Sequence, residues 1–187
     1  MANWKSIIGK SFNTADFEPY VQSIHLTNWH PRFVVLHNTV NPRLSEWHQV
    51  SGAQRMLNLA GYYRDKMRWS AGPHLFIADD LIWVFTPLNT PGVHSPSWNA
   101  FSWGVEMVGD YSKEPFTEAV KTNTVAALAA LHSLAGIDPH TLRLHKEDPK
   151  TTHDCPGKAI DKNNVIASVV AALASNSPGE HMPGAAG

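Results

Sequence analysis

The chain has 187 residues, with 15 lysines and arginines against 16 aspartates and glutamates, so its formal net charge is −1. This length predicts one domain with a sizeable core, and the balanced charge gives no support for nucleic acid as a partner, because phosphate binding needs clustered positive charge. The single cysteine excludes an internal disulfide framework, and no stretch approaches the roughly 20 apolar residues of a membrane span. Residues 1–10 lack the apolar segment of a signal peptide, so we expect synthesis in the cytoplasm without membrane insertion.

The first third of the chain predicts a lead-in, a strand and a helix. Residues 1–31 have a polar mix with two prolines and are expected to be irregular. Residues 33–37 form a short apolar run bounded by a proline and an asparagine, which is typical of a buried strand. Apolar residues then recur at helical spacing over residues 45–67, with Ser45 as the expected N-cap.

The middle of the chain predicts two paired strands, a long loop and a further strand. Residues 74–78 and 81–85 are apolar and flank two aspartates, which indicates a hairpin. Residues 87–102 contain three prolines and no clear period, which predicts a loop. Loops of that length inside a compact domain are usually functional. Residues 103–108 indicate another strand.

The last third predicts two helices and a tail. Residues 117–135 carry an apolar stripe at helical spacing, and Gly136 is the expected stop signal. An Ala- and Val-rich segment over residues 159–174 predicts a second helix, and the Ser-, Pro- and Gly-rich residues 175–187 are expected to be disordered. The pattern as a whole predicts an α/β domain over residues 1–174, with helices packed on a mixed sheet.

Two segments that are far apart in the sequence carry side chains that bind transition metals. His37 ends the first predicted strand, and His145 and Cys155 lie ten residues apart on a polar stretch that is expected to be a loop. Three ligands of mixed nitrogen and sulfur type leave one tetrahedral position open for water, which is typical of catalytic zinc. Taken one at a time, a histidine beside an apolar strand is more often a core or surface residue, and a lone cysteine is usually a small buried hydrophobe.

Four short segments carry a more specific signal when they are taken together. They are VLHNT at 35–39, PHLFI at 73–77, WGVEMVG at 103–109, and His145 followed by DCPG at 154–157. In this order they resemble the zinc-dependent type 2 N-acetylmuramoyl-L-alanine amidases, which include phage lysozyme-like amidases, cytoplasmic muropeptide amidases and peptidoglycan recognition proteins. The resemblance implies a mixed central β-sheet flanked by helices, and one zinc ion per chain held by His37, His145 and Cys155.

Two further residues are candidates for catalysis. Glu106 interrupts an otherwise apolar strand, where an unpaired carboxylate would be costly to bury. The resemblance implies that it acts as general base and then passes a proton to the leaving amine; the alternative is a solvated strand face. Many relatives carry lysine two residues before the last ligand, where this chain has His153. An imidazole can donate a hydrogen bond to an oxyanion in the same place, but its charge depends on pH. The alternative for His153 is an exposed loop histidine.

Four residues are candidates for contact with substrate. His74 and His94 are expected to line the cleft, and the loop that contains His94 also carries Trp98 and Asn99 as a candidate wall for glycan or peptide. A tyrosine precedes the strand with His74 in the phage-type and recognition-type members, whereas this chain has Pro73. The tyrosine's role is therefore either absent or taken by Glu106.

The resemblance implies hydrolysis of the amide between N-acetylmuramic acid and L-alanine, by a monomer acting on peptidoglycan or muropeptides. We expect a phage-type endolysin, and a cytoplasmic muropeptide-recycling amidase is the alternative role. Three other functions remain open. They are a non-catalytic peptidoglycan-binding module, a peptidase in which Cys155 is the nucleophile with His153 or His145 as its base, and a structural zinc site on a scaffold.

Overall fold

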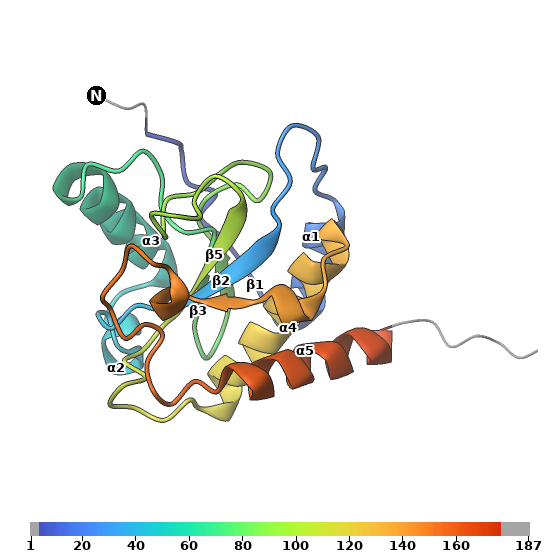
Figure 1. Ribbon diagram of the computed structural model, residues 1–187. Helices are drawn as coiled ribbons and strands as arrows, with labels where there is room; N and C mark the ends of the chain where they lie inside the picture. The colour runs from blue at the N-terminus through green and yellow to red at the C-terminus, as the bar shows by residue number, and fades with distance from the viewer. Residues whose placement is uncertain (1–3, 177–187) are drawn as a thin grey trace, which may run out of the picture.

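The computed structural model describes residues 4–176 of the chain. Within these residues a six-stranded sheet runs through the middle of the molecule (Figure 1). The strands are β1 (Lys10–Phe12), β2 (Phe33–Asn38), β3 (Leu75–Ile77), β4 (Ile82–Val84), β5 (Ser102–Met107) and β6 (Arg143–Leu144). Their spatial order is β1-β4-β3-β5-β2-β6. Strands β3, β5, β2 and β6 are parallel to one another, whereas β4 is antiparallel to both β3 and β1. The predicted mixed sheet is therefore confirmed.

Helices cover both faces of this sheet. On one side α1 (Thr14–Gln22) and α5 (Lys162–Asn176) pack against α4 (Glu118–Ala135), which itself contacts β3 and β4. On the other side lie α2 (Leu44–Trp47), α3 (Gly52–Gly61) and a π-helical turn (Tyr62–Lys66), and Figure 1 shows α3 on the side of the sheet away from α4 and α5. Short 3₁₀ turns (Pro139–Thr141 and His145–Glu147) flank β6.

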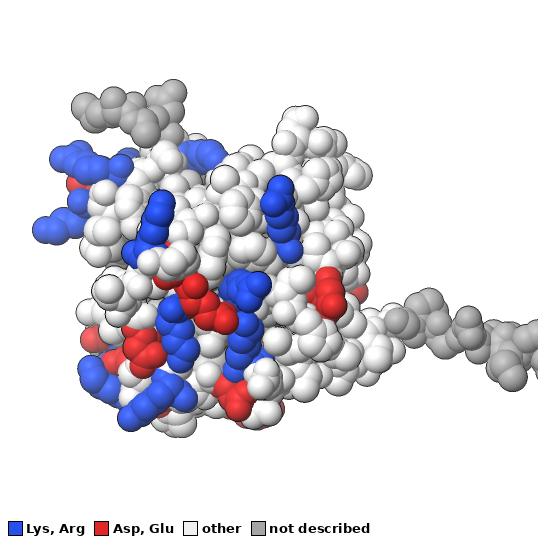
Figure 2. All heavy atoms as spheres, viewed as in Figure 1, with Lys and Arg blue, Asp and Glu red and all other residues white. Residues whose placement is uncertain are grey.

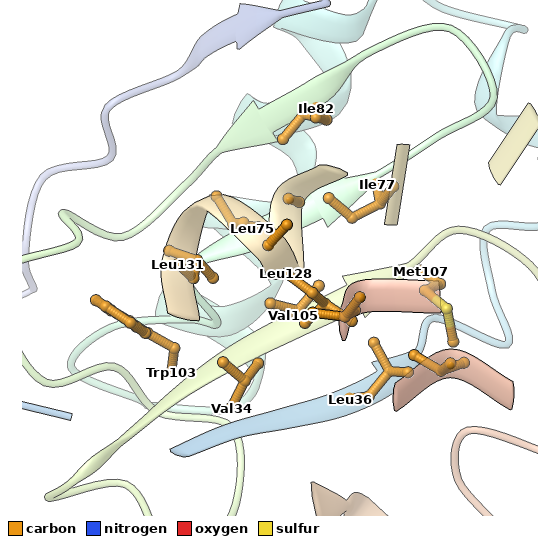
Figure 3. Close-up of a cluster of buried hydrophobic side chains, with 14 of the residues drawn as sticks. Val34, Leu36, Leu75, Ile77, Ile82, Trp103, Val105, Met107, Leu128 and Leu131 are labelled. Atoms are coloured by element: carbon orange, nitrogen blue, oxygen red, sulfur yellow. The ribbon is translucent and has the colours of Figure 1, made fainter. Parts of the chain in front are cut away.

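Side chains alternate between the two faces of the sheet along the strands β2 and β5, and this alternation determines which helices they contact. Val34 and Leu36 of β2 and Val105 of β5 point into the core with Leu128 and Leu131 of α4 (Figure 3). Successive side chains of a strand point to opposite faces, so the residues between them face the α3 side. Those intervening residues include the polar residues of the candidate site.

The prediction that residues 1–31 form an irregular lead-in is wrong. Residues 10–12 pair with β4 as an edge strand, and Asn13 caps α1 by accepting a hydrogen bond from the Asp16 N–H at 2.8 Å. Phe17 and Val21 of this helix are fully buried in the main core. The N-terminal segment is thus a structural part of the domain.

The single helix predicted over residues 45–67 is also wrong, because the structure breaks it at residues 48–51. Arg43, and not Ser45, is the N-cap of α2, and Ser51 caps α3 by accepting from the Gln54 N–H at 3.3 Å. The Arg55 guanidinium donates to the carbonyl groups of Glu46 and Trp47. These carbonyls end α2, so the side chain satisfies acceptors that a continuous helix would have paired itself.

The remaining elements agree with the sequence to within a few residues. The hairpin, the strand at 103–108 and the helix at 117–135 are confirmed as β3–β4, β5 and α4, and Gly136 ends α4 with a φ of 62°. Helix α5 begins three residues later than expected and continues to Asn176; residues 177–187 of the predicted tail lie outside the described residues.

Two surface properties bear on partners. None of the helices within residues 4–176 is long and apolar enough to cross a membrane. Basic and acidic side chains are interspersed on the face shown in Figure 2 rather than gathered by sign. Oppositely charged side chains also pair on the surface, such as Lys162 with Glu147 at 2.8 Å and Lys146 with Asp154 at 3.4 Å.

Candidate metal centre and active site

The site is built at the carboxyl ends of the parallel strands. His37 is the fifth residue of β2 and lies in register with Glu106 of β5. Both alternate with core residues, so both face the α3 side of the sheet. Leu144 of β6 pairs with Leu36, which places His145 just past the end of the same sheet. The carboxyl edge of parallel strands is the usual position of binding sites in open α/β sheets.

His37, His145 and Cys155 come together there. One donor atom from each lies within 4.8 Å of the others, and the two imidazole centroids are 4.3 Å apart. The Lys146 N–H donates to the Cys155 carbonyl at 2.8 Å, which folds the loop back so that the cysteine returns to His145. The Nε2 atom of His145 is buried and has no hydrogen-bond partner among the described residues. Two imidazoles and a thiol with an orphaned nitrogen fit a zinc ion.

The surroundings of Cys155 oppose a role as free nucleophile. Burial and then the charge of Glu106 raise the pKa of its thiol, while the hydrogen bond from the Asn38 N–H to Sγ, at 3.3 Å, acts in the opposite direction and is weaker. Reactive cysteines have lowered pKa values, because the thiolate is the attacking form. The burial and the raised pKa of the thiol therefore favour a thiolate that forms on metal binding over a Cys-His peptidase.

Glu106 faces the same space. Its Oε1 lies 3.9 Å from Nδ1 of His37, and its side chain is 13 % exposed. Burial raises the pKa of Glu106 to about 8. A carboxyl group with this environment is suited to proton transfer near neutral pH, whereas a carboxylate on a solvated strand face would not have a raised pKa.

Three adjoining cavities surround these groups. The central one, of about 400 Å³, is lined by His37, His94, Glu106, His145, His153 and Cys155, among others. A second, of about 480 Å³, shares Glu106 with it and extends along α3 past Arg55, Asn58, Tyr62 and Tyr63. A third, of about 560 Å³, shares His145 and His153 and extends past Trp69, Ser95, Asn99 and Lys150. The candidate metal centre thus lies between two flanking pockets.

His153 lies at the junction of two of these cavities. Its exposed side chain lines both the central and the third cavity, and its ring centroid is 6.2 Å from that of His145. The position leaves its ring accessible to a molecule in the central cavity.

The predicted contact of His74 with substrate is not compatible with the structure. The residue is 0 % exposed, and both ring nitrogens are engaged within the protein. The Gly104 N–H donates to Nδ1 at 3.0 Å, and Nε2 lies 3.0 Å from the Thr90 carbonyl. Burial lowers the pKa of His74 to about 3, so the ring is neutral. His74 holds the 87–102 loop against β5.

His94 lines the cleft as expected, at both the central and the third cavity, but its ring nitrogens are engaged within the protein. Its Nδ1 lies 3.1 Å from Nε2 of His37 and its Nε2 lies 3.2 Å from the Ser102 carbonyl. Burial lowers the pKa of His94 to about 4, which keeps the ring neutral near pH 7. Both ring nitrogens contact the protein, so neither is free to bind a substrate. The expected role of His94 in substrate binding therefore does not agree with its contact to His37.

The two other predicted wall residues have different positions. Asn99 lines the third cavity, while its Oδ1 accepts from the N–H groups of His94 and Ser95, both at 2.7 Å. Trp98 packs edge-on against Phe33 at 5.5 Å and lines none of the three cavities. Trp69 lines two of them.

Two residues of the site carried no usable sequence signal. Tyr63 is buried in the π-helical turn and lines the second cavity with Glu106, whose charge adds to burial in raising the tyrosine's pKa. Asp148 is buried and accepts hydrogen bonds from Ser95 Oγ at 2.5 Å, the Ser97 N–H at 3.0 Å and the Lys150 N–H at 2.8 Å. Burial alone would raise the pKa of Asp148, but these hydrogen bonds outweigh it and lower the pKa. Asp148 ties the loop of His94 to the loop of His145.

Comparison with known proteins identifies a matching protein family. Residues 27–158 match the family model described as Amidase_2, N-acetylmuramoyl-L-alanine amidase. The fold is similar to the N-acetylmuramoyl-L-alanine amidase LysC of Clostridium intestinale, with 25% identity, 79% of this chain and 91% of that chain covered, and a TM-score of 0.62. The endolysin amidase LysCS of the same organism gives 25% identity, 76% and 86% coverage, and a TM-score of 0.61.

More distant likenesses are to peptidoglycan recognition proteins. Drosophila PGRP-LB shares 20% identity over 83% of this chain and 86% of that chain, with a TM-score of 0.61, and at this identity the likeness shows the fold alone. Peptidoglycan-recognition protein 1 of Holotrichia diomphalia is 25% identical over 83 residues, which are 43% of this chain and 41% of that relative. The match thus spans about two fifths of the curated relative. Because the family model covers most of the chain, including β2, β5 and all the candidate ligands, the protein belongs to the N-acetylmuramoyl-L-alanine amidase family.

Proposed function

We propose that this protein is a zinc amidase that hydrolyses the amide bond between N-acetylmuramic acid and L-alanine in peptidoglycan. The observation that carries the proposal is the convergence of His37, His145 and Cys155 within 4.8 Å, beside the buried carboxyl group of Glu106. Membership in the amidase family supports amide hydrolysis as the reaction class. The similarity of this chain to the two Clostridium intestinale amidases supports the muramoyl–alanine amide as its substrate.

The three ligands suit a catalytic metal. Two neutral imidazoles and one thiolate would hold a single zinc ion with one tetrahedral position left for water or substrate. When bound, zinc supplies positive charge that polarises a carbonyl group, acidifies water and favours the ionised form of a nearby carboxyl group.

Glu106 is the proposed general base and acid. Its carboxylate would take the proton from the water that attacks the lactyl carbonyl carbon. As the carbon–nitrogen bond breaks, the same carboxyl group would return that proton to the amine nitrogen of L-alanine. Burial raises its pKa, which keeps its basicity high enough for both transfers.

His153 is the proposed hydrogen-bond donor to the developing oxyanion. Its exposed ring lines the central cavity on the side of His145, where a donor would face the oxygen of the attacked carbonyl. With the scissile bond in the central cavity, the glycan and the stem peptide would extend into the two flanking cavities. Asn99 and Trp69 would contribute to one wall and Asn58 to the other, and Tyr62 lines both cavities.

The biological role that we propose is that of a phage-type endolysin. The support is the similarity to an endolysin amidase at 25% identity, together with an exposed cleft that continues on both sides of the central cavity. An endolysin would cleave intact cell-wall peptidoglycan, whereas a recycling amidase would prefer small soluble muropeptides. Comparing the two substrates at equal muramoyl-alanine concentration separates these roles.

The zinc site is tested by measuring zinc content and amide cleavage together. His37→Ala and Cys155→Ala should each lose bound zinc and turnover, because each removes one of three ligands. His140→Ala, which removes an exposed histidine paired with Asp138, is the matched control and should keep both. Turnover that is retained in His37→Ala would end the zinc proposal. If wild type binds zinc and cleaves nothing, the protein is a binding module or carries structural zinc.

A further inference from the structure

A row of hydrogen bonds links the backbone of β5 to the first candidate metal ligand. It runs from the Ser102 carbonyl to Nε2 of His94 at 3.2 Å, and from Nδ1 of His94 to Nε2 of His37 at 3.1 Å. The row ends at Nδ1 of His37, which lies 3.9 Å from Glu106 Oε1. These contacts come from β5, the 87–102 loop and β2, so the row is set by tertiary structure.

The direction of each hydrogen bond in this row follows from the Ser102 carbonyl at its first end. A backbone carbonyl can only accept, so Nε2 of His94 must carry the proton. In a neutral imidazole the other nitrogen then has a lone pair, so Nδ1 of His94 accepts. Nε2 of His37 must therefore be the donor. The remaining nitrogen of His37, Nδ1, is left with its lone pair directed away from His94.

The His94 ring is held so that it can act in this way. The backbone N–H of His94 donates to Asn99 Oδ1 at 2.7 Å, which fixes the backbone of the loop. Its ring lies against Gly104, where an added Cβ would come within 2.3 Å of the ring atom Cγ. Only a residue without a side chain at position 104 leaves room for the ring between β5 and His37. The position is thus built around this imidazole.

We infer that His94 is a positioning residue that keeps the proton of His37 on Nε2 and so presents the Nδ1 lone pair to the metal. The inference rests on the metal site proposed above and adds a role for a residue outside the ligand set. A metal-binding histidine usually needs a partner for its other nitrogen, and losing that partner typically weakens metal affinity by about 10- to 100-fold.

The first test reads the His37 tautomer in the metal-free protein by long-range ¹H–¹⁵N NMR correlation. We expect the proton on Nε2 of both His37 and His94 in wild type. A proton on Nδ1 of His37 would overturn the inference, whatever the metal affinity. Because this measurement uses no metal, it is separate from the zinc proposal: a wild type that binds no zinc would end that proposal and leave the tautomer readable.

The second test compares zinc dissociation constants, measured by competition with a chromophoric chelator. His94→Phe keeps a ring against Gly104 and removes the acceptor, so its zinc affinity should fall about 10- to 100-fold. His94→Asn is the matched rescue, because an amide oxygen near the former Nδ1 position can accept from His37; most of the affinity should return. The inference is wrong if folded His94→Phe binds zinc as wild type does. It is also wrong if His94→Asn and His94→Phe, both folded, lose affinity equally.

Discussion

Glu106 is the residue on which the proposed chemistry depends most directly. It is the acidic residue that faces His37 across the two central strands, and its raised pKa follows from burial. Glu106→Gln keeps the shape of the side chain and removes its basicity. We expect bound zinc to be retained and turnover to fall by about 10²-fold or more, measured as release of L-alanine-terminated peptides alongside metal analysis.

Glu118→Gln provides the control for this substitution, because Glu118 is an exposed carboxylate at the start of α4. It should turn over at the wild-type rate. A Glu106→Gln protein that also keeps near wild-type turnover would remove Glu106 from the reaction and return it to a structural role.

His74 makes the stability of the metal-free protein depend on pH. Its pKa is about 3 in the folded state, below the ordinary value of 6.5, because burial disfavours the charged ring. Between these values the unfolded chain binds a proton at His74 that the folded chain does not, so the stability that His74 contributes is fully present above pH 6.5 and is lost as the pH falls toward 3. One such group contributes a slope of up to about 1.4 kcal/mol per pH unit.

The measurement is the free energy of unfolding in urea at pH 7, 6 and 5. The buried rings of His37 and His94 have lowered pKa values and act with the same sign, so the wild-type slope includes their contributions. His74→Gln should be less stable than wild type at pH 7. Its free energy of unfolding should fall less steeply on acidification, by up to about 1.4 kcal/mol per pH unit, because the variant lacks one proton-binding group. Equal slopes for the two proteins would show that His74 is not a buried neutral base.

At the scale of elements, the loop of His94 and the loop of His145 are joined through Asp148. Three donors converge on this buried carboxylate. Asp148→Asn replaces one carboxylate oxygen with an NH₂ group, which would point at an N–H or O–H donor and leave it without an acceptor. We therefore expect the free energy of unfolding to fall by about 1–3 kcal/mol. Asp138→Asn, an exposed capping residue, should change it much less. An equal loss in both would mean that Asp148 does not hold the loops together.

Sequence reasoning identified the elements whose patterns are strong and missed those that are short. The apolar runs of β2 and β5 and the long stripe of α4 are visible without tertiary context. The two-residue strand β6 has no such pattern, because a strand of that length is defined by its partner. Helix α1 was missed because Pro19 lies inside it, although Asn13 and the spacing of Phe17 and Val21 were available as signals.

The site shows the same division. His37, Glu106, His145 and Cys155 were predicted as a group, and the structure brings them together, while their roles stay proposals. The errors concern residues whose surroundings are set by tertiary contacts. His74 was expected to line the cleft, but it is fully buried, and its ring nitrogens contact the distant residues Thr90 and Gly104. No local pattern could have shown this.

At the scale of the whole molecule, the helices on one face support the strands whose other side carries the site. Phe17 of α1 is fully buried in the main core, where its ring packs edge-on against Phe12 of β1. Phe17→Ala should lower the free energy of unfolding by about 3–5 kcal/mol, measured by urea denaturation. Glu18→Ala, which removes a half-buried side chain that accepts a surface hydrogen bond from Asn176, should change it by about 0.5 kcal/mol or less. Similar small effects of both would show that residues 14–22 are not part of the cooperative core.

The central claim is that the site formed by β2, β5 and the His145–Cys155 loop is a metal-dependent amidase. Mass spectrometry of the products from purified peptidoglycan tests it most directly, with the protein as isolated, after chelation, and after zinc is restored. We predict peptides with a free L-alanine amine in the first and third samples and none in the second. Cleavage that continues in the chelated, metal-free protein would contradict the claim and point to Cys155 as a nucleophile. No cleavage by the folded, zinc-loaded protein would contradict it as well.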